Sequence, residues 1–169
     1  MRAALDRLYL ASAWLAALGM IGTLVFVLLG IAGRFFNWFI PGTDAYAGYC
    51  MAASGFLALA HTLKRGEHIR VSLVLEHLNP RHRHRVELFA LTVATFLAAA
   101  FAFYSVRLVY QSFDFNDVST GNDATPLWIP ELAMAIGTLV LLIAFIDEWV
   151  LEWTGKRDYA VPEEALHNE

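Results

Sequence analysis

The sequence has few charged residues and a single cysteine, and both shortages narrow what the chain can be. Charged residues make up 17% of the 169 residues and hydrophobic residues 58%, whereas soluble domains are nearer one quarter charged. The lone cysteine, Cys50, excludes an internal disulfide framework. The length indicates one domain, residues 1–169. The apolar excess indicates an integral membrane protein.

Motifs for catalysis and for cofactor binding are also missing. The chain contains no Walker sequence, no GxSxG, no HExxH and no CxxC. His61 is the only histidine inside an apolar run, whereas a haem-b bundle uses two axial histidines at membrane depth. No pair of carboxylates deep in an apolar run suggests a proton path. We therefore expect no catalytic residue, no metal site, no cofactor and no nucleic-acid partner.

What the chain does contain is four long apolar runs. They cover residues 8–36, 44–63, 86–112 and 127–153, and about twenty helical residues suffice to cross the hydrocarbon core. The first run is far longer than the apolar region of a cleavable signal peptide, so we expect it to be retained as a span. The second is rich in Ala, Gly and Ser, which in lipid favours packing among other helices. The sequence thus predicts an all-α integral membrane protein with four transmembrane helices.

The connection between the second and third runs, residues 64–85, is basic. Within it, Val71, Val74, Leu75 and Leu78 follow the spacing of one helix face. This segment is too short to span, so we predict a short amphipathic helix lying in the membrane interface. Its polar residues, with their flanking neighbours, are expected to contact phospholipid headgroups. These are Lys64, Arg65, His68, Arg70, Arg81, Arg83 and Arg85.

The basic residues are distributed unevenly between the two ends of the predicted spans. Ten of the twelve Lys and Arg residues lie in the N-terminal segment, in the connection 64–85 and in the polar tail 154–169. The turn 37–43 and the acidic loop 113–125 contain none. Cytoplasmic loops carry the excess of basic residues. We therefore predict that both termini and the basic connection are cytoplasmic, and that the turn and the acidic loop face outward.

Two pairs of ionisable residues fall near the outer ends of the predicted spans. Arg34 ends the first span and Asp44 begins the second, and the turn between them brings these ends together. We expect them to form a structural ion pair, with lipid phosphate or a partner protein as the alternative contact for Arg34. Arg107 and Glu131 lie at a similar level. They either pair with each other or each reach water alone.

Four segments, in order and with fitting spacing, carry a family resemblance. They are GRFF (33–36), TDAYAGY (43–49), LKRGEHIRVSLVLEHL (63–78) and TPLWIP (125–130). Together they resemble the small membrane subunit of tripartite ATP-independent periplasmic (TRAP) transporters. The chain departs from the family pattern at Ala45, where a second acid is usual, at Ser72, where Asp usually follows Val71, and at Ala53, where helix two often has tryptophan.

The resemblance implies a complex with a large TRAP membrane subunit and a periplasmic substrate-binding protein, in the bacterial cytoplasmic (inner) membrane. The large subunit would hold the substrate and sodium sites and move as an elevator. The small subunit would brace it and help dock the binding protein, for sodium-driven uptake of small organic acids. We expect the large subunit to meet the small-residue faces of spans one and two and aromatic residues of span four. Candidate partner contacts are Trp38, Asp114, Asp117, Trp128 and Glu131.

Three other functions stay open at this point. A four-span membrane enzyme would need a polar cluster that converges from several helices, and the sequence does not supply one. A haem-b electron carrier is disfavoured by the single histidine in a span. The small subunit of a tricarboxylate transporter is a near relative in function, and the basic motif at residues 63–78 argues against it.

Overall fold

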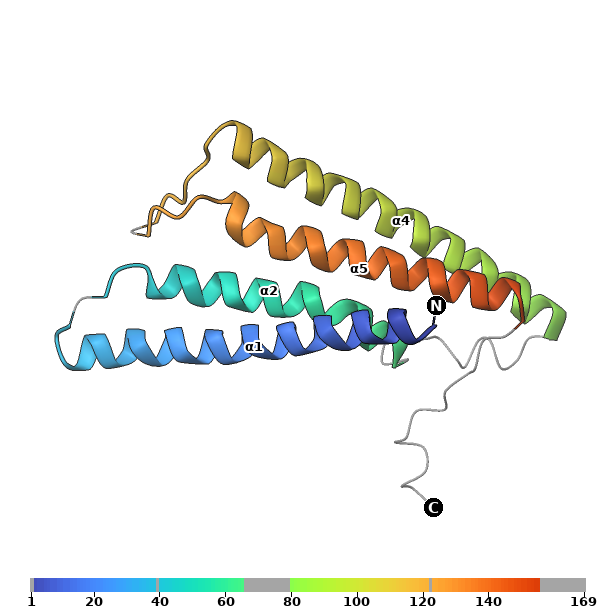
Figure 1. Cartoon of the computed structure of the whole chain (residues 1–169), viewed down its shortest axis with the longest axis horizontal. Helices are drawn as coiled ribbons and strands as arrows, with labels where there is room; N and C mark the ends of the chain where they lie inside the picture. Colours follow the sequence, from blue (N-terminus) through green and yellow to red (C-terminus); the bar gives the residue numbers. More distant parts are fainter. Residues whose placement is uncertain (1, 39, 66–79, 122, 156–169) are drawn as a thin grey trace, which may run out of the picture.

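The chain folds into four long α-helices arranged as two antiparallel hairpins (Figure 1). The computed structural model describes residues 2–38, 40–65, 80–121 and 123–155. The helices are α1 (Arg2–Phe35), α2 (Thr43–Lys64), α4 (Pro80–Asp114) and α5 (Trp128–Trp153). The described residues contain no β-strand beyond one isolated bridge in the loop between α4 and α5. The predicted all-helical class is therefore confirmed, whereas the predicted interfacial helix falls outside the described residues.

Two of the helices, α1 and α4, are several residues longer than the apolar runs that predicted them. α1 has 34 residues and α4 has 35, so each extends about 50 Å, well beyond a hydrocarbon core of about 30 Å. Both extensions lie at the amino-terminal ends, where charged turns continue the apolar helix. Backbone hydrogen bonding propagates into the polar region because water and headgroups solvate the charged side chains there.

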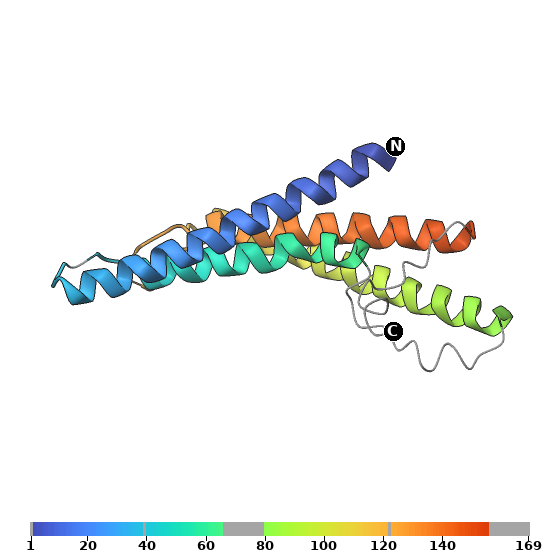
Figure 2. The same ribbon diagram turned by 90° about the horizontal axis from the view of Figure 1, so that it is seen from below.

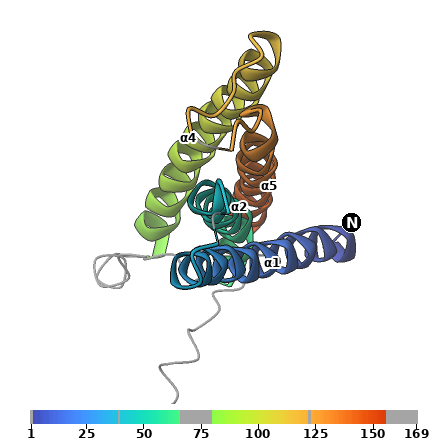
Figure 3. The ribbon, with the colours of Figure 1, turned by 90° about the vertical axis from the view of Figure 1, so that its left-hand side faces the viewer.

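Three of the described helices are long and apolar enough to cross a membrane: α1, α4 and α5. The second helix, α2, has 22 residues but lies outside this group because its Gly, Ser, Thr, Tyr and His residues lower its mean hydropathy. α2 lacks an extensive apolar outer surface and instead packs against neighbouring helices on two faces. It lies along α1 on one side and against α5 on another, and Figure 3 shows it between α1 and the α4–α5 pair.

Left-handed residues end two helices at the same end of the bundle. Asn37 has φ 54 and follows α1, and Trp38 N–H donates to Gly33 O at 2.7 Å. Asn116 has φ 52 and follows α4, and Asp117 N–H donates to Ser112 O at 2.9 Å. A residue in the left-handed conformation with such a bond closes a helix C-terminus. We call this end, with turn 36–42 and loop 115–127, the loop end, and the opposite one the terminal end.

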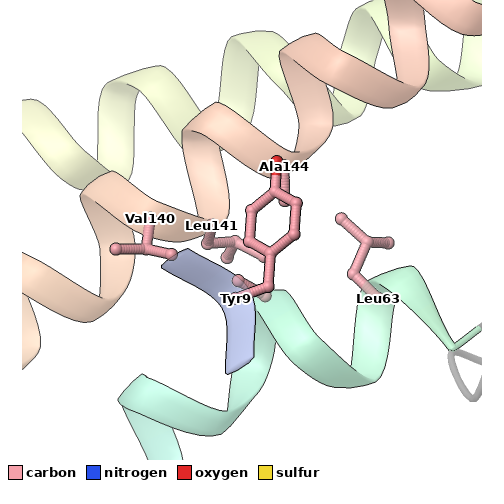
Figure 4. Close-up of a cluster of buried hydrophobic side chains, with 6 residues drawn as sticks. Tyr9, Leu63, Val140, Leu141 and Ala144 are labelled. Atoms are coloured by element: carbon pink, nitrogen blue, oxygen red, sulfur yellow. The ribbon is translucent and has the colours of Figure 1, made fainter. Parts of the chain in front are cut away.

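The apolar core lies toward the terminal end, where three helices meet (Figure 4). It consists of Tyr9 of α1, Ala60 and Leu63 of α2, and Val140, Leu141 and Ala144 of α5. Away from this cluster, α1 and α4 diverge toward their amino termini (Figure 2). Large apolar side chains cover their outward faces, for example Leu24 and Phe96. Such faces are typical of helices that contact lipid.

Candidate functional sites at the two ends of the bundle

An ionic cluster joins α2 to α5 at the terminal end. The Nζ of Lys64 donates to Asp147 Oδ2 and, at 2.9 Å, to Glu148 Oε1. The same ammonium lies 5.4 Å from the centre of the Tyr9 ring, within cation–π range. Only 19% of the Lys64 side chain is exposed. Acids near a helix C-terminus oppose the helix dipole, and the last turn of α5 contains no basic residue, so α5 depends on cations from its neighbours.

A second set of polar contacts joins α4 to α5 at this end. His84 Nδ1 lies 2.8 Å from Glu152 Oε1, and Glu152 is only 2% exposed. One turn along α4, Arg83 Nε donates to Glu87 Oε1 at 3.1 Å. The three acids near the C-terminus of α5, Asp147, Glu148 and Glu152, therefore face α2 and α4 rather than water. The terminal end is held by charge as well as by the apolar core.

The structure places the residues predicted to contact lipid in different environments. Lys64 lies in the ionic cluster with 19% of its side chain exposed, and Arg83 is bonded to Glu87 with 39% of its side chain exposed. Arg65 and Arg85 are exposed at the terminal end. His68 and Arg70, and the side chain of Arg81, lie outside the described residues.

The amino-acid sequence alone does not show the partners of Lys64 and His84. These partners, Asp147, Glu148 and Glu152, lie near the C-terminal end of α5. A usable signal was present, because three acids crowd a helix C-terminus that has no basic residue of its own. Such a terminus needs cations from another segment.

At the loop end, Arg34 and Asp44 lie close together across the turn. Arg34 Nη2 is 3.5 Å from Asp44 Oδ2, and the two side chains are 80% and 86% exposed. Exposed ion pairs contribute at most about 1 kcal/mol to stability. The turn itself is fixed by Gly42, whose φ of 80 suits glycine.

The acidic loop between α4 and α5 folds back onto α2. Tyr49 Oη donates to Asp123 Oδ2 at 2.9 Å, and Ser119 Oγ donates to Asp123 Oδ1 at 2.8 Å. Ser119 N–H also donates to Thr125 O at 2.8 Å, which closes the loop on itself. Desolvation raises the pKa of the Asp123 carboxyl, but hydrogen bonds from Thr125, Ser119 and Tyr49 outweigh it and lower the pKa from 3.8 to about 2.

We expect acid to release this loop from α2. Because the folded pKa of Asp123 is lowered, its stabilisation is complete above about pH 4 and is lost as the pH falls toward 2. Asp123→Asn should release the loop at neutral pH, whereas the exposed Asp114→Asn should not. Hydrogen exchange of residues 115–127, normalised to an unfolded peptide of the same sequence, measures the release. Equal protection in both variants at neutral pH would contradict the role of Asp123.

The predicted partner contacts are spread over the loop end. Trp38, Asp114 and Asp117 are exposed, whereas Trp128 is partly buried with its ring 5.8 Å from that of Phe113, edge to face. The Oε2 atom of Glu131 is buried and has no hydrogen-bond partner among the described residues.

Arg107 and Glu131, the other candidate pair, are not joined in the described part of the chain. Arg107 is exposed on α4, and no salt bridge between the two is present among the described residues. No group of three or more His, Cys, Asp or Glu residues suited to a metal ion occurs in that same part of the chain.

Comparison with known families identifies the chain. Residues 20–155 match the DctQ component of tripartite ATP-independent periplasmic transporters. No curated protein matches the sequence. The match begins near the middle of α1 and runs past the end of α5, and therefore includes α2, α4, α5 and most of the two sites described above. The chain belongs to the DctQ family and is the small component of a TRAP transporter.

Proposed function

We propose that this chain is the small permease subunit of a sodium-coupled TRAP transporter that takes up small organic acids. It braces the large elevator subunit in the membrane and assists docking of the periplasmic substrate-binding protein. The match to the DctQ component over residues 20–155 carries this proposal. The distribution of charge supports a bracing role, because residues 8–33, 45–63, 88–106 and 132–146 contain no Asp, Glu, Lys or Arg. Transporters usually bind their substrate near the membrane midplane. The uncharged middles of these four segments therefore favour a bracing role over a substrate site in this chain.

In this proposal α2 is the fourth span of a single domain in the bacterial inner membrane, with both termini in the cytoplasm. The basic residues support this orientation, since they gather at the terminal end. α2 packs antiparallel to α1 and parallel to α5 along their lengths, which supports its crossing the membrane with them. The exposed Arg65 and Arg85 at that end suit anionic headgroups of the inner leaflet.

The glycines of α1 pack against other parts of this chain. A Cβ at Gly19 would lie 3.0 Å from Cys50 O, and one at Gly22 would lie 3.0 Å from Cys50 Sγ. These glycines therefore serve the close approach of α1 to α2 within this chain. We therefore propose that α2, rather than the large subunit, packs on the glycine face of span one.

The open face of α2 remains as the candidate contact with the large subunit. Gly48 and Gly55 have nothing within 4 Å of an added Cβ, and Ala52 between them is exposed. The spacing of four and then three residues places all three on one side of the helix. Small residues gain little from lipid but allow another helix to approach closely. We therefore propose that a transmembrane helix of the large subunit packs along this face.

Tryptophan substitution tests this face. Gly55→Trp should leave the isolated chain folded and reduce co-purification with the large subunit at least about tenfold, because the bulky ring blocks close helix approach. The matched control is Leu24→Trp on the outward face of α1, which exchanges one large apolar group for another and should not affect the yield. The assay co-expresses the tagged chain with the adjacent large membrane reading frame and measures the stoichiometry after mild detergent extraction. Wild-type yield of complex from Gly55→Trp would exclude this face.

Reconstitution tests the transport role. Vesicles that contain this chain and the large subunit should take up substrate only with a sodium gradient and with the binding protein present. If uptake persists without this chain, the bracing role is wrong. If the purified chain has a chromophore or a catalytic activity of its own, a membrane enzyme is the better description.

A further inference from the structure

A cavity of about 560 Å³ opens at the loop end, between the last turns of α1, the turn 36–42 and the first turn of α2. Leu29 and Ile40 line it with apolar groups, and Arg34 and Asp44 line it with opposite charges. Gly33 lies beneath the turn, where an added Cβ would meet Trp38 O at 2.6 Å. The cavity therefore combines an apolar wall with one cation and one anion.

The two charges keep most of their hydrogen-bonding capacity. Arg34 and Asp44 meet at 3.5 Å through one atom each, and their side chains are 80% and 86% exposed. A guanidinium has five N–H donors and a carboxylate accepts several bonds. An exposed pair with this geometry stabilises the fold little. Both groups can therefore bind a ligand that carries a negative and a positive charge close together.

The surroundings place this cavity at the level of lipid headgroups. Phe35, Phe36 and Trp38, which follow or end α1, are all more than 70% exposed. Exposed aromatic residues at the end of a membrane helix sit at the boundary between headgroups and hydrocarbon. Leu29, about one turn before Arg34, lies on the hydrocarbon side of that boundary.

We propose that this cavity binds the headgroup of phosphatidylethanolamine. Arg34 binds the phosphate, Asp44 accepts hydrogen bonds from the primary ammonium, and Leu29 and Ile40 contact the apolar part of the lipid. Phosphatidylglycerol has the phosphate but no cation for Asp44. A free phosphate ion would use neither Asp44 nor the apolar wall. Lipid binding in this cavity does not require transport activity and does not depend on which leaflet the cavity faces.

Native mass spectrometry of the full-length chain in mild detergent tests the proposal. With equimolar phosphatidylethanolamine and phosphatidylglycerol, we expect one phosphatidylethanolamine retained with about tenfold preference, since a charge-assisted hydrogen bond distinguishes the two. Arg34→Gln should reduce retention about tenfold, and Asp44→Asn should abolish the preference between the lipids. Arg107→Gln, an exposed arginine of α4 near the same end, is the matched control and should retain the lipid.

A cavity-filling variant covers the case in which the charge variants fold poorly. Ala45 lines the cavity, and Ala45→Phe keeps both charges while it fills the space, so it should also lose the lipid. Soluble glycerophosphoethanolamine should compete with the lipid far better than inorganic phosphate. Equal retention of the two lipids by the wild type, equal competition by phosphate, or full retention by Arg34→Gln would overturn the proposal. Loss of the lipid when the large subunit binds would also overturn it, because the cavity would then belong to a protein contact.

Discussion

Replacing Lys64 by methionine is expected to destabilise the chain by about 3–5 kcal/mol, the usual cost of removing one partner from a buried ion pair. The ammonium is mostly buried and bonds both Asp147 and Glu148. Without it, two carboxylates at the C-terminal end of α5 repel each other and oppose the helix dipole. The free energy of unfolding in mixed detergent micelles, followed by circular dichroism, measures the loss.

Two further variants separate this effect from a general loss of positive charge. Arg85→Met removes one exposed cation at the same end and should change stability by no more than about 0.5 kcal/mol. Adding Asp147→Asn and Glu148→Gln to Lys64→Met removes the uncompensated charges and should recover much of the lost stability. If Lys64→Met and Arg85→Met cost the same, the ionic cluster contributes nothing specific.

The membrane-crossing helices followed closely from the sequence because hydrocarbon imposes a simple requirement. A run of about twenty apolar residues has one stable form in lipid, a helix that satisfies its own backbone. The observed α5 (Trp128–Trp153) begins within one residue of the predicted span. The sequence did not predict the amino-terminal turns of α1 and α4. The apolar run shows where the chain enters the hydrocarbon core, but the helix continues into the polar region beyond it.

The contacts between helices were harder to predict, because they depend on how each helix is rotated and staggered. Lys64 and Asp147 are 83 residues apart, and nothing in either segment alone states that they meet. The basic residues were therefore assigned together to lipid, and the ion pairs of Lys64 with α5 were not foreseen. Similarly, the glycines of α1 were correctly recognised as a packing face, but the sequence does not say that the partner is α2 of the same chain.

Glycine substitutions at two positions separate internal packing from open surface, and the expected difference is large. At Gly137 of α5 an added Cβ would lie 2.6 Å from both the carbonyl carbon and the oxygen of Phe56. These are backbone atoms of α2, so the helix itself must move. Gly137→Ala is expected to cost about 1–3 kcal/mol, as overpacking does. Gly137→Leu should separate α2 from α5 and prevent a stable fold.

The control for this prediction is Gly55→Ala, because the same substitution in α2 meets nothing within 4 Å. Alanine favours a helix over glycine by up to about 1 kcal/mol, so Gly55→Ala should leave stability unchanged or raise it. Gly137→Ala is therefore expected to lower the free energy of unfolding and Gly55→Ala is not, although the two substitutions are chemically identical. Phe56 also packs on Phe101 of α4, with ring centres 6.0 Å apart. A shift of α2 at Gly137 would accordingly loosen its contact with α4 as well. Equal effects at both positions would mean that α2 and α5 are not in close contact at Gly137.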